Sequence, residues 1–303
     1  MINKFLSHPK YSRFMFFLLL FVSICLNSII LRNQTNFYIL YIFCAIFLGI
    51  GYYNSPKWFI FMLTLAIVVC RYFLIPESAA SAATFFTYLL TYLLITFMSV
   101  GLMLNVQKVT EENVELTKAL SNALDTRDTF TLHHSENVAK YAVDIAERMK
   151  LPPYLCKVIH IGGLLHDIGK IGIPEHILSK PGRLEEDEYE LIKSHPFIGY
   201  EMIKHVKQYE SSGILDIVLY HHERYDGLGY PKGLKGEEIP LVARIIAVAD
   251  TFDAMSSKRV YRDAIELSEI LAEIERNKGK QFDPVIADHF LALFDEGGAE
   301  RGV

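Results

Sequence analysis

The 303-residue sequence contains few cysteines and no excess of basic residues. Cys25, Cys44 and Cys70 lie in apolar segments, and only Cys156 lies beyond them. This spacing provides neither a disulfide framework nor a paired-cysteine metal motif, and it agrees with a reducing compartment. The net charge of −5 excludes a general affinity for nucleic acid polymers, so an anionic ligand would need a local positive site. Strand-length alternation of apolar and polar residues is also absent, which predicts an all-α fold.

Long apolar runs, by contrast, fill the first hundred residues. Four windows reach or approach the length of a bilayer's hydrocarbon core, at 14–31, 37–53, 58–75 and 84–104. A signal peptide is the alternative for the first window, but no small-residue cleavage site closes it and three similar windows follow. The basic residues of the short loops predict that both termini lie in the cytoplasm, namely Lys4, Lys10, Arg13, Lys57 and Lys108. We therefore expect a multi-pass protein of the inner (cytoplasmic) membrane, with lipid around residues 1–104.

A connecting, signalling helix is predicted at 105–124. Apolar residues recur there at alternating spacings of three and four, with one Asn among them: Val106, Val109, Asn113, Leu116, Leu120 and Ala123. Such a heptad pattern with a single Asn is typical of two-stranded coiled coils, which favours a parallel homodimer. The alternative is a single amphipathic helix packed on its own domain, because the pattern lasts less than three heptads.

The histidines are concentrated in the remaining domain, 125–303. Nine of the eleven fall between His133 and His222. Apolar periodicity in this domain predicts helices at 135–150, 153–166, 185–204, 213–222, 241–256, 267–277 and 284–294. Scattered surface histidines would not gather in this way, so their positions at the ends of these helices are informative.

The stretch LLHDIGKIGIP contains the first candidate site. His166 and Asp167 close an apolar helix, where an unpaired carboxylate is costly unless it binds a metal or another partner. Lys170 follows Asp167 by three residues, so a continued helical turn would place it on the same side, where it could pair with a phosphate. The alternative is a helix C-terminus with a surface lysine, shaped by Gly169 and Gly172.

Asp250 presents the same problem within RIIAVADTFDAM. It lies on the apolar stripe of its helix, where a carboxylate requires a cation or, alternatively, the backbone amides of another element. The combined candidates are five imidazoles and two carboxylates without sulfur, from His134, His166, Asp167, His195, His221, His222 and Asp250. This set is too large for one mononuclear site and suits two metals that share a carboxylate. Such ligands favour iron, manganese or zinc over calcium.

The domain resembles the HD-GYP branch of the HD metal-dependent phosphohydrolases. The resemblance covers residues 120–294, and its motifs occur in order as DTFTLHHSENV, LLHDIGKIGIP, KSHPFIGYEM, HHERYDGLGYPKGLKGEEIP and ARIIAVADTFDAMSSKRVYR. It implies two-metal hydrolysis of cyclic di-GMP to pGpG, with further cleavage to GMP as an option. It also implies two divalent ions, expected to be iron or manganese, and signalling partners such as a diguanylate cyclase.

The resemblance assigns roles residue by residue. His134, His166, Asp167 and Asp250 are similar to the ligands of one metal, and the second metal would take His195, His221 and His222 with Asp167 shared. Phe130 stands where relatives with a third metal carry Glu, which favours two metals and the product pGpG. Lys170 is similar to the lysine that meets a substrate phosphate. Further nucleotide contacts are implied for Tyr230, Asp253, Arg259 and Arg262.

Three other functions are compatible with parts of the sequence. A receptor that binds cyclic di-GMP without cleaving it is disfavoured, because every ligand of a two-metal site is present. An HD phosphohydrolase for another nucleotide is the second alternative: the GYP block disfavours mononucleotides and leaves cyclic GMP-AMP open. Transport by the membrane half is disfavoured because its four windows contain few polar residues.

Overall fold

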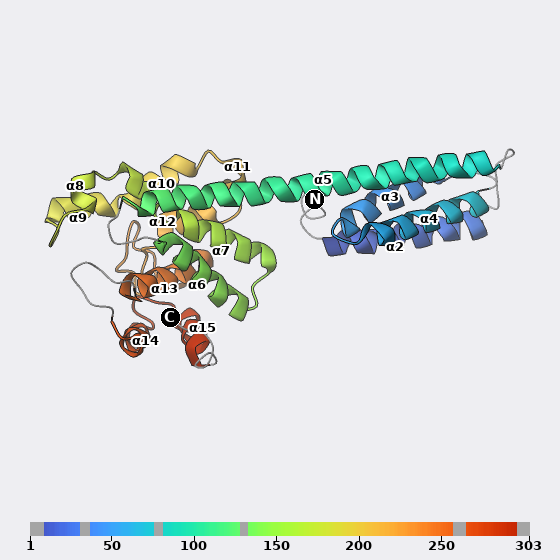
Figure 1. Ribbon diagram of the computed structural model, residues 1–303. Coiled ribbons are helices and arrows are strands. Elements are labelled where there is room, and N and C mark those ends of the chain that lie inside the picture. The colour runs from blue at the N-terminus through green and yellow to red at the C-terminus, as the bar shows by residue number, and fades with distance from the viewer. Residues whose placement is uncertain (1–8, 31–36, 76–80, 128–132, 257–264, 296–303) are drawn as a thin grey trace. The chain divides into compact units, whose positions relative to one another are not determined.

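The computed structural model describes residues 9–30, 37–75, 81–127, 133–256 and 265–295. The chain forms two compact units, Met1–Glu112 and Asn113–Val303. The boundary falls within one continuous helix, α5 (Ala82–Asp125), which is drawn in cyan to green in Figure 1. Arg259, Arg262 and Phe130 lie outside the described residues.

The N-terminal unit consists of helices that bury one another's apolar faces. They are α2 (Pro9–Cys25) with its π-helical extension η1 (Leu26–Ile30), α3 (Tyr38–Tyr52), α4 (Lys57–Leu74) and the first half of α5. Tyr41, Leu48 and Ile67 are fully buried in its interior. Outward-facing side chains are also apolar, and Phe73 and Leu90 are 74% and 72% exposed. An apolar outer surface of this kind is compatible with a lipid environment.

Among the described residues, three helices are long and apolar enough to cross a membrane, as the sequence predicted for three of its windows: Pro9–Ser28, Lys57–Leu74 and Ala82–Asp125. The fourth prediction is not confirmed. Helix α3 is apolar but has 15 residues, which corresponds to about 22 Å against a hydrocarbon core of about 30 Å. A four-span topology therefore stays a prediction.

The second unit is all-α in the described residues, with one isolated bridge between Lys278 and Phe282 and no sheet. Its longer helices are α6 (His134–Arg148), α7 (Pro153–Leu165), α9 (Glu186–Lys193), α10 (His195–Ile203), α12 (Ile214–Tyr220), α13 (Leu241–Ser256), α14 (Leu267–Arg276) and α15 (Pro284–Asp295). Short helical turns join them at η2 (Ile168–Gly172), α8 (Glu175–Leu178), α11 (Lys207–Glu210) and η3 (Gly236–Glu238). The all-α prediction is confirmed.

One predicted helix was wrong in its extent. The pattern predicted a single helix at 185–204, but the chain forms α9 and α10 with a break at Ser194. Pro196 explains the break, because proline lacks the N–H of the helical ladder and its ring clashes with the carbonyl four residues earlier, here that of Ile192. The break places His195, a candidate metal ligand, at the first position of α10.

Two hydrophobic clusters hold the ligand-bearing helices together: a large one and a smaller one of Leu124, Leu165, Ile168, Ile214 and Val218. Helix α6 packs on α7 and α13, and α10 packs on α12 and η2. The large cluster is built from fully buried side chains of several helices, including Val138, Ile145, Ile159, Ile245, Phe252 and Phe290. Because side chains in such cores are close-packed, the helices' ends are held in fixed positions relative to one another.

Candidate metal centre

Three histidines share one arrangement at the ends of helices. The last carbonyls of a helix have no partner in its own ladder. Here the Nδ1 atoms lie beside the carbonyl oxygen three residues earlier: His166 at 2.7 Å from Gly163, His195 at 2.6 Å from Ile192 and His221 at 3.0 Å from Val218. A carbonyl can only accept, so each Nδ1 carries the proton and each Nε2 of the neutral ring keeps its lone pair.

His195 depends on the break between α9 and α10. Since Pro196 has no N–H, it cannot donate to the carbonyl of Ile192 as a helical residue would. That carbonyl accepts the Nδ1–H of His195 instead. The proline therefore both ends α9 and leaves the carbonyl of Ile192 available to the hydrogen bond that orients this imidazole.

His134 is held by two carboxylates of α13. Its Nδ1 lies 2.7 Å from Asp253 Oδ2, and its Nε2 lies 3.2 Å from Asp250 Oδ1. The Asp253 side chain is only 3% exposed. Asp253 thus orients His134 from behind, as outer carboxylates commonly do for metal-binding histidines.

The end of α5 holds the first turn of α6, which begins at His134. Asp125 accepts the backbone N–H and the hydroxyl of Ser135 at 3.1 and 2.8 Å. Lys118 and Asn122 reach the carboxylate of Glu136 at 2.6 and 2.8 Å. A displacement of α5 would therefore act on residues that adjoin a candidate metal ligand.

Asp167 lies between two groups of candidate ligands. Its Oδ1 is 3.1 Å from His195 Nε2 and 3.8 Å from His221 Nε2. Its Oδ2 is 3.4 Å from His166 Nε2 and 4.0 Å from His134 Nε2. One oxygen faces each group, which is the arrangement that a shared carboxylate between two metals requires.

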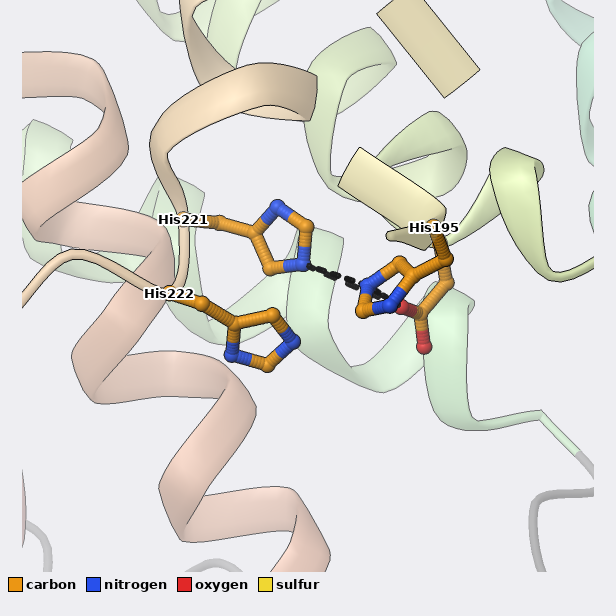
Figure 2. A group of neighbouring side chains, drawn as sticks. His195, His221 and His222 are labelled. Atoms are coloured by element: carbon orange, nitrogen blue, oxygen red, sulfur yellow. Dashed lines mark hydrogen bonds and ion pairs between the residues drawn. The ribbon is translucent and has the colours of Figure 1, made fainter. Parts of the chain in front are cut away.

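The ligand atoms in each group lie within 4.8 Å of one another. We call them the His195 group, with Asp167, His195, His221 and His222, and the His134 group, with His134, His166 and Asp250. Figure 2 shows the rings of His221 and His222 side by side, with His195 facing them from another element.

The donor atoms of the His195 group fit a cation. His195 Nε2 and His221 Nε2 are 3.3 Å apart, and with both protons on Nδ1 these are two lone pairs that face each other and Asp167. In the His134 group, His166 Nε2 is buried and has no hydrogen-bond partner in the described part of the chain. One divalent ion in each group, with nitrogen and oxygen ligands at about 2.0–2.2 Å, would satisfy these atoms.

The protonation states of the His195 group agree with metal binding. Burial, together with the neighbouring His195, lowers the pKa of His222 to about 3. Burial likewise holds the pKa of His221 well below its ordinary value. Burial alone would raise the pKa of Asp167, but Lys170 and His166 outweigh it and hold that pKa well below its ordinary value. Neutral imidazoles and an ionised carboxylate are the forms that bind metals.

In the His134 group, by contrast, burial alone would lower the pKa of His134, but the hydrogen bonds with Asp250 and Asp253 outweigh the effect of burial and raise that pKa to about 10. A metal ion there would therefore have to displace a proton.

A cavity of about 340 Å³ opens beside the two groups. It is lined by residues that include Tyr189, His222, Tyr230, Asp250, Thr251 and Gln281. Tyr230 lies with its ring 4.8 Å from that of His222. Lys193 Nζ lies 5.5 Å from the centre of the Tyr230 ring and 5.6 Å from that of Tyr189, so positive charge and aromatic faces meet at this cavity.

The glycine-rich turn after His222 folds back onto the histidine itself. Tyr230 donates its backbone N–H to the carbonyl of His222 at 3.2 Å. A Cβ on Gly229 would lie 2.3 Å from Arg224 N and 2.5 Å from His222 O, closer than any side chain can approach. Glycine is therefore required for this close contact between the turn and the ligand-bearing backbone.

Glu223 holds the far side of the same turn. Its carboxylate is buried and accepts the backbone N–H groups of Lys232 at 2.7 Å and Leu234 at 3.0 Å. Sequence reasoning overlooked Glu223 and also Tyr189 and Gln281. The signal for Glu223 was its place directly after two candidate ligands, whereas Tyr189 and Gln281 reach the cavity only through tertiary packing.

The structure brings together all seven predicted metal ligands. Among the described residues, those predicted to contact the nucleotide do not lie together in the same way. Tyr230 lines the cavity, and Lys170 Nζ lies 2.6 Å from Asp167 Oδ2 with its side chain 20% exposed. The Asp253 carboxylate is buried and contacts His134, and its nucleotide contact stays a prediction. Arg259 and Arg262 lie outside the described residues.

We expect Asp253→Ala to weaken metal binding by about 10–100-fold, because His134 would lose the partner that orients it. Asp253→Asn keeps an acceptor oxygen for His134 Nδ1–H and should retain most of the affinity. Titration of the metal-free protein with Mn(II) measures both variants. Unchanged affinity in Asp253→Ala would show that the contact does not position His134.

The comparisons with known proteins concern the second unit. A profile of the HD-domain family matches residues 118–286. The chain is 42% identical over 191 residues to the cyclic di-GMP phosphodiesterase response regulator RpfG of Xanthomonas campestris, covering 63% of this chain and 50% of the relative. It is 42% identical over 186 residues to a cyclic di-GMP phosphodiesterase of Thermotoga maritima, covering 60% and 50%.

A third relative has a different named substrate. The chain is 35% identical over 202 residues to the 3′3′-cGAMP-specific phosphodiesterase 2 of Vibrio cholerae, covering 67% of this chain and 38% of the relative. The chain thus spans half the length, or less, of these three relatives.

Proposed function

The chain belongs to the HD-domain family, and on this premise we propose that it is a metal-dependent phosphodiesterase that hydrolyses cyclic di-GMP to pGpG. The observation that carries the proposal is the position of Asp167, one oxygen of which faces each of two groups of buried ligand atoms. The names of the two relatives at 42% identity support the substrate.

The residues of the site would have two tasks: binding the metal ions and the substrate, and stabilising negative charge on the phosphate. Two divalent ions, iron or manganese in our proposal, would lower the pKa of an attacking water and neutralise charge that develops on the phosphate. The His195 group and the His134 group would hold them, with Asp167 in common. Lys170 places a positive charge beside Asp167, where it would stabilise the non-bridging phosphate oxygens. Tyr230 and Tyr189 offer aromatic faces to a base.

The membrane half completes the proposal. We propose that four spans anchor the chain in the inner membrane, that the catalytic domain lies in the cytoplasm, and that the membrane half controls it, with partners such as a diguanylate cyclase nearby. Three helices of sufficient length and apolar character support the anchoring. The contacts of Asp125, Asn122 and Lys118 with the first turn of α6 support a route of control through α5.

Product analysis tests the proposed activity. Full-length protein, purified without oxygen and loaded with Fe(II) or Mn(II), is incubated with cyclic di-GMP beside the Asp167→Asn variant. We expect pGpG from the unsubstituted protein only, and little GMP. Tight binding without cleavage under every metal condition would make the protein a receptor and overturn the proposal.

Cyclic GMP-AMP is a second candidate substrate. The relative at 35% identity is named as specific for 3′3′-cGAMP, and the metal-binding residues do not distinguish between the two cyclic dinucleotides. The same assay with both substrates at equal concentration decides between them by the ratio of kcat/KM. A ratio in favour of cyclic GMP-AMP would reassign the substrate and leave the metal centre as proposed.

A further inference from the structure

Helix α5 carries an exposed apolar stripe along the segment that connects the two units. We call it the α5 seam, and it consists of Val106, Val109, Asn113, Leu116, Leu120 and Ala123, all of them exposed. Leu116 and Leu120, its two largest residues, are 61% and 53% exposed. Isolated exposed apolar residues are common, but a row of them along one helix face marks an interaction surface.

The second unit packs against a different face of the same helix. Thr117, Ser121 and Leu124 are buried, with exposed fractions of 9%, 0% and 7%. At about 100° of rotation per residue, this buried face lies roughly a quarter turn from the seam. The heptad pattern is therefore not explained by packing of the helix on its own domain, which was the alternative for this segment. If the α5 seam is covered, its binding partner must be something other than this domain.

The pattern of residues points to a second copy of this chain. We propose that the α5 seam binds the α5 seam of a second copy in a parallel two-stranded coiled coil. The seam positions are valine, leucine or alanine except for Asn113, which takes the first position of the central heptad. Two Asn side chains can pair with each other there and fix both register and strand number. An Asn carries both a donor and an acceptor, so a copy of itself satisfies it.

The flanking positions are compatible with the parallel arrangement. In a parallel pair, the positions that flank the seam correspond as Asn105 with Thr110, Glu112 with Thr117, and Ala119 with Leu124. Thr117 and Leu124 are buried against their own domain, so only Asn105 and Thr110 would meet across the two chains. None of these pairs joins two like charges, so no electrostatic repulsion opposes this register. The charged residues Lys108, Glu111 and Glu115 lie on the remaining surface of the helix.

The seam is short, so the stability of its dimer depends on how close together the two copies are held. The 18 residues of the seam, from 106 to 123, correspond to about 27 Å of helix, which is less than the roughly three to four heptads expected of a coiled coil. Two copies anchored in one membrane have a high effective concentration, and a common topology would make their α5 helices parallel. This step uses the anchoring proposed above, whereas the exposure of the seam does not depend on the catalytic activity.

Cysteine crosslinking of the full-length protein in its membrane tests the proposal. Leu116→Cys places a thiol in the seam, and Glu115→Cys places one on the adjacent, outward-facing position of the same helix. Both sites are exposed in the single chain, so neither substitution should disturb folding. After mild oxidation, we expect at least about ten times more disulfide-linked dimer from Leu116→Cys, since disulfides form only within a narrow range of Cα separation. The unsubstituted chain measures the background from its four native cysteines.

Two differently tagged copies, expressed together, identify the crosslinked partner. The proposal requires both tags in the Leu116→Cys product. Equal crosslinking at both positions would mean random collision, and a product that contains only one tag and a second protein would mean another occupant; either result overturns the proposal. Loss of phosphodiesterase activity would not affect this readout, so failure of the proposed function and failure of the dimer are distinguishable.

Discussion

Replacing Asp167 by Asn is expected to lower cyclic dinucleotide hydrolysis at least about 1,000-fold, which corresponds to about 4 kcal/mol of transition-state stabilisation. The two carboxylate oxygens face different groups, at 3.1 Å from His195 Nε2 and 3.4 Å from His166 Nε2. An amide has one neutral oxygen and an NH₂ group, so it cannot present an anionic oxygen to both sides. A single substitution should therefore impair both metal positions.

The effect should be chemical and not a failure to fold. Asn is close to Asp in size, so the helical content of the metal-free protein should change little. Its melting temperature should fall, because Lys170 loses the carboxylate that it contacts at 2.6 Å. Metal content by mass spectrometry and turnover are the decisive measurements. Asp187→Asn makes the same chemical change at an exposed position of α9 and serves as the control. Wild-type turnover by Asp167→Asn would refute the assignment of the shared ligand.

Gly169→Ala is expected to disrupt the His195 group through backbone packing. A Cβ at residue 169 would lie 1.9 Å from the carbonyl oxygen of His195 and 2.5 Å from the backbone N of Gly199. Both are main-chain atoms of α10, so no side-chain rotation can relieve the overlap. Overpacking of cores typically costs about 1–3 kcal/mol, and a backbone clash at this distance should cost at least the upper end of that range.

Gly172→Ala is the matched control in the same 3-10 helix. Its Cβ would lie 3.0 Å from Cγ2 of Ile198, the end of a side chain that can shift, so we expect a change in the free energy of unfolding within about 1 kcal/mol. Thermal melting of the metal-free proteins and their metal content compare the two. In Gly169→Ala, α10 must move away from Asp167, and metal bound per chain should fall even where the protein still folds. Similar stability and metal content in both alanine variants would contradict this account of how η2 and α10 hold the site.

Much of the local structure could be predicted from the sequence because it depends on short-range periodicity. The predicted range 241–256 agrees with helix α13, and the predicted ranges for the other helices of the second unit agree within two residues, apart from 185–204. Candidate ligands could be recognised because histidines and aspartates at the ends of apolar helices are costly without a partner. The break at Ser194 was not predicted because the apolar spacing continues across it. Pro196, which interrupts the helical hydrogen bonds, is nevertheless visible in the sequence.

The arrangement of the site required the tertiary structure. No spacing rule relates His134 to Asp253, which lie 119 residues apart and 2.7 Å from each other, so the role of Asp253 behind His134 was missed. The same holds for the two oxygens of Asp167, which face imidazoles from four different segments, and for Tyr189 and Gln281 at the cavity.

For α5, too, the sequence and the tertiary structure determine different properties. The sequence by itself determined the heptad pattern, the order of the HD motifs and the identity of the candidate ligands, because these are properties of neighbouring residues. Only the tertiary structure decided which face of α5 is buried against its own domain and which oxygen of Asp167 faces which group of histidines. Those facts depend on how helices distant in the chain pack together, and close packing of their side chains selects one arrangement among the many that the same local pattern allows.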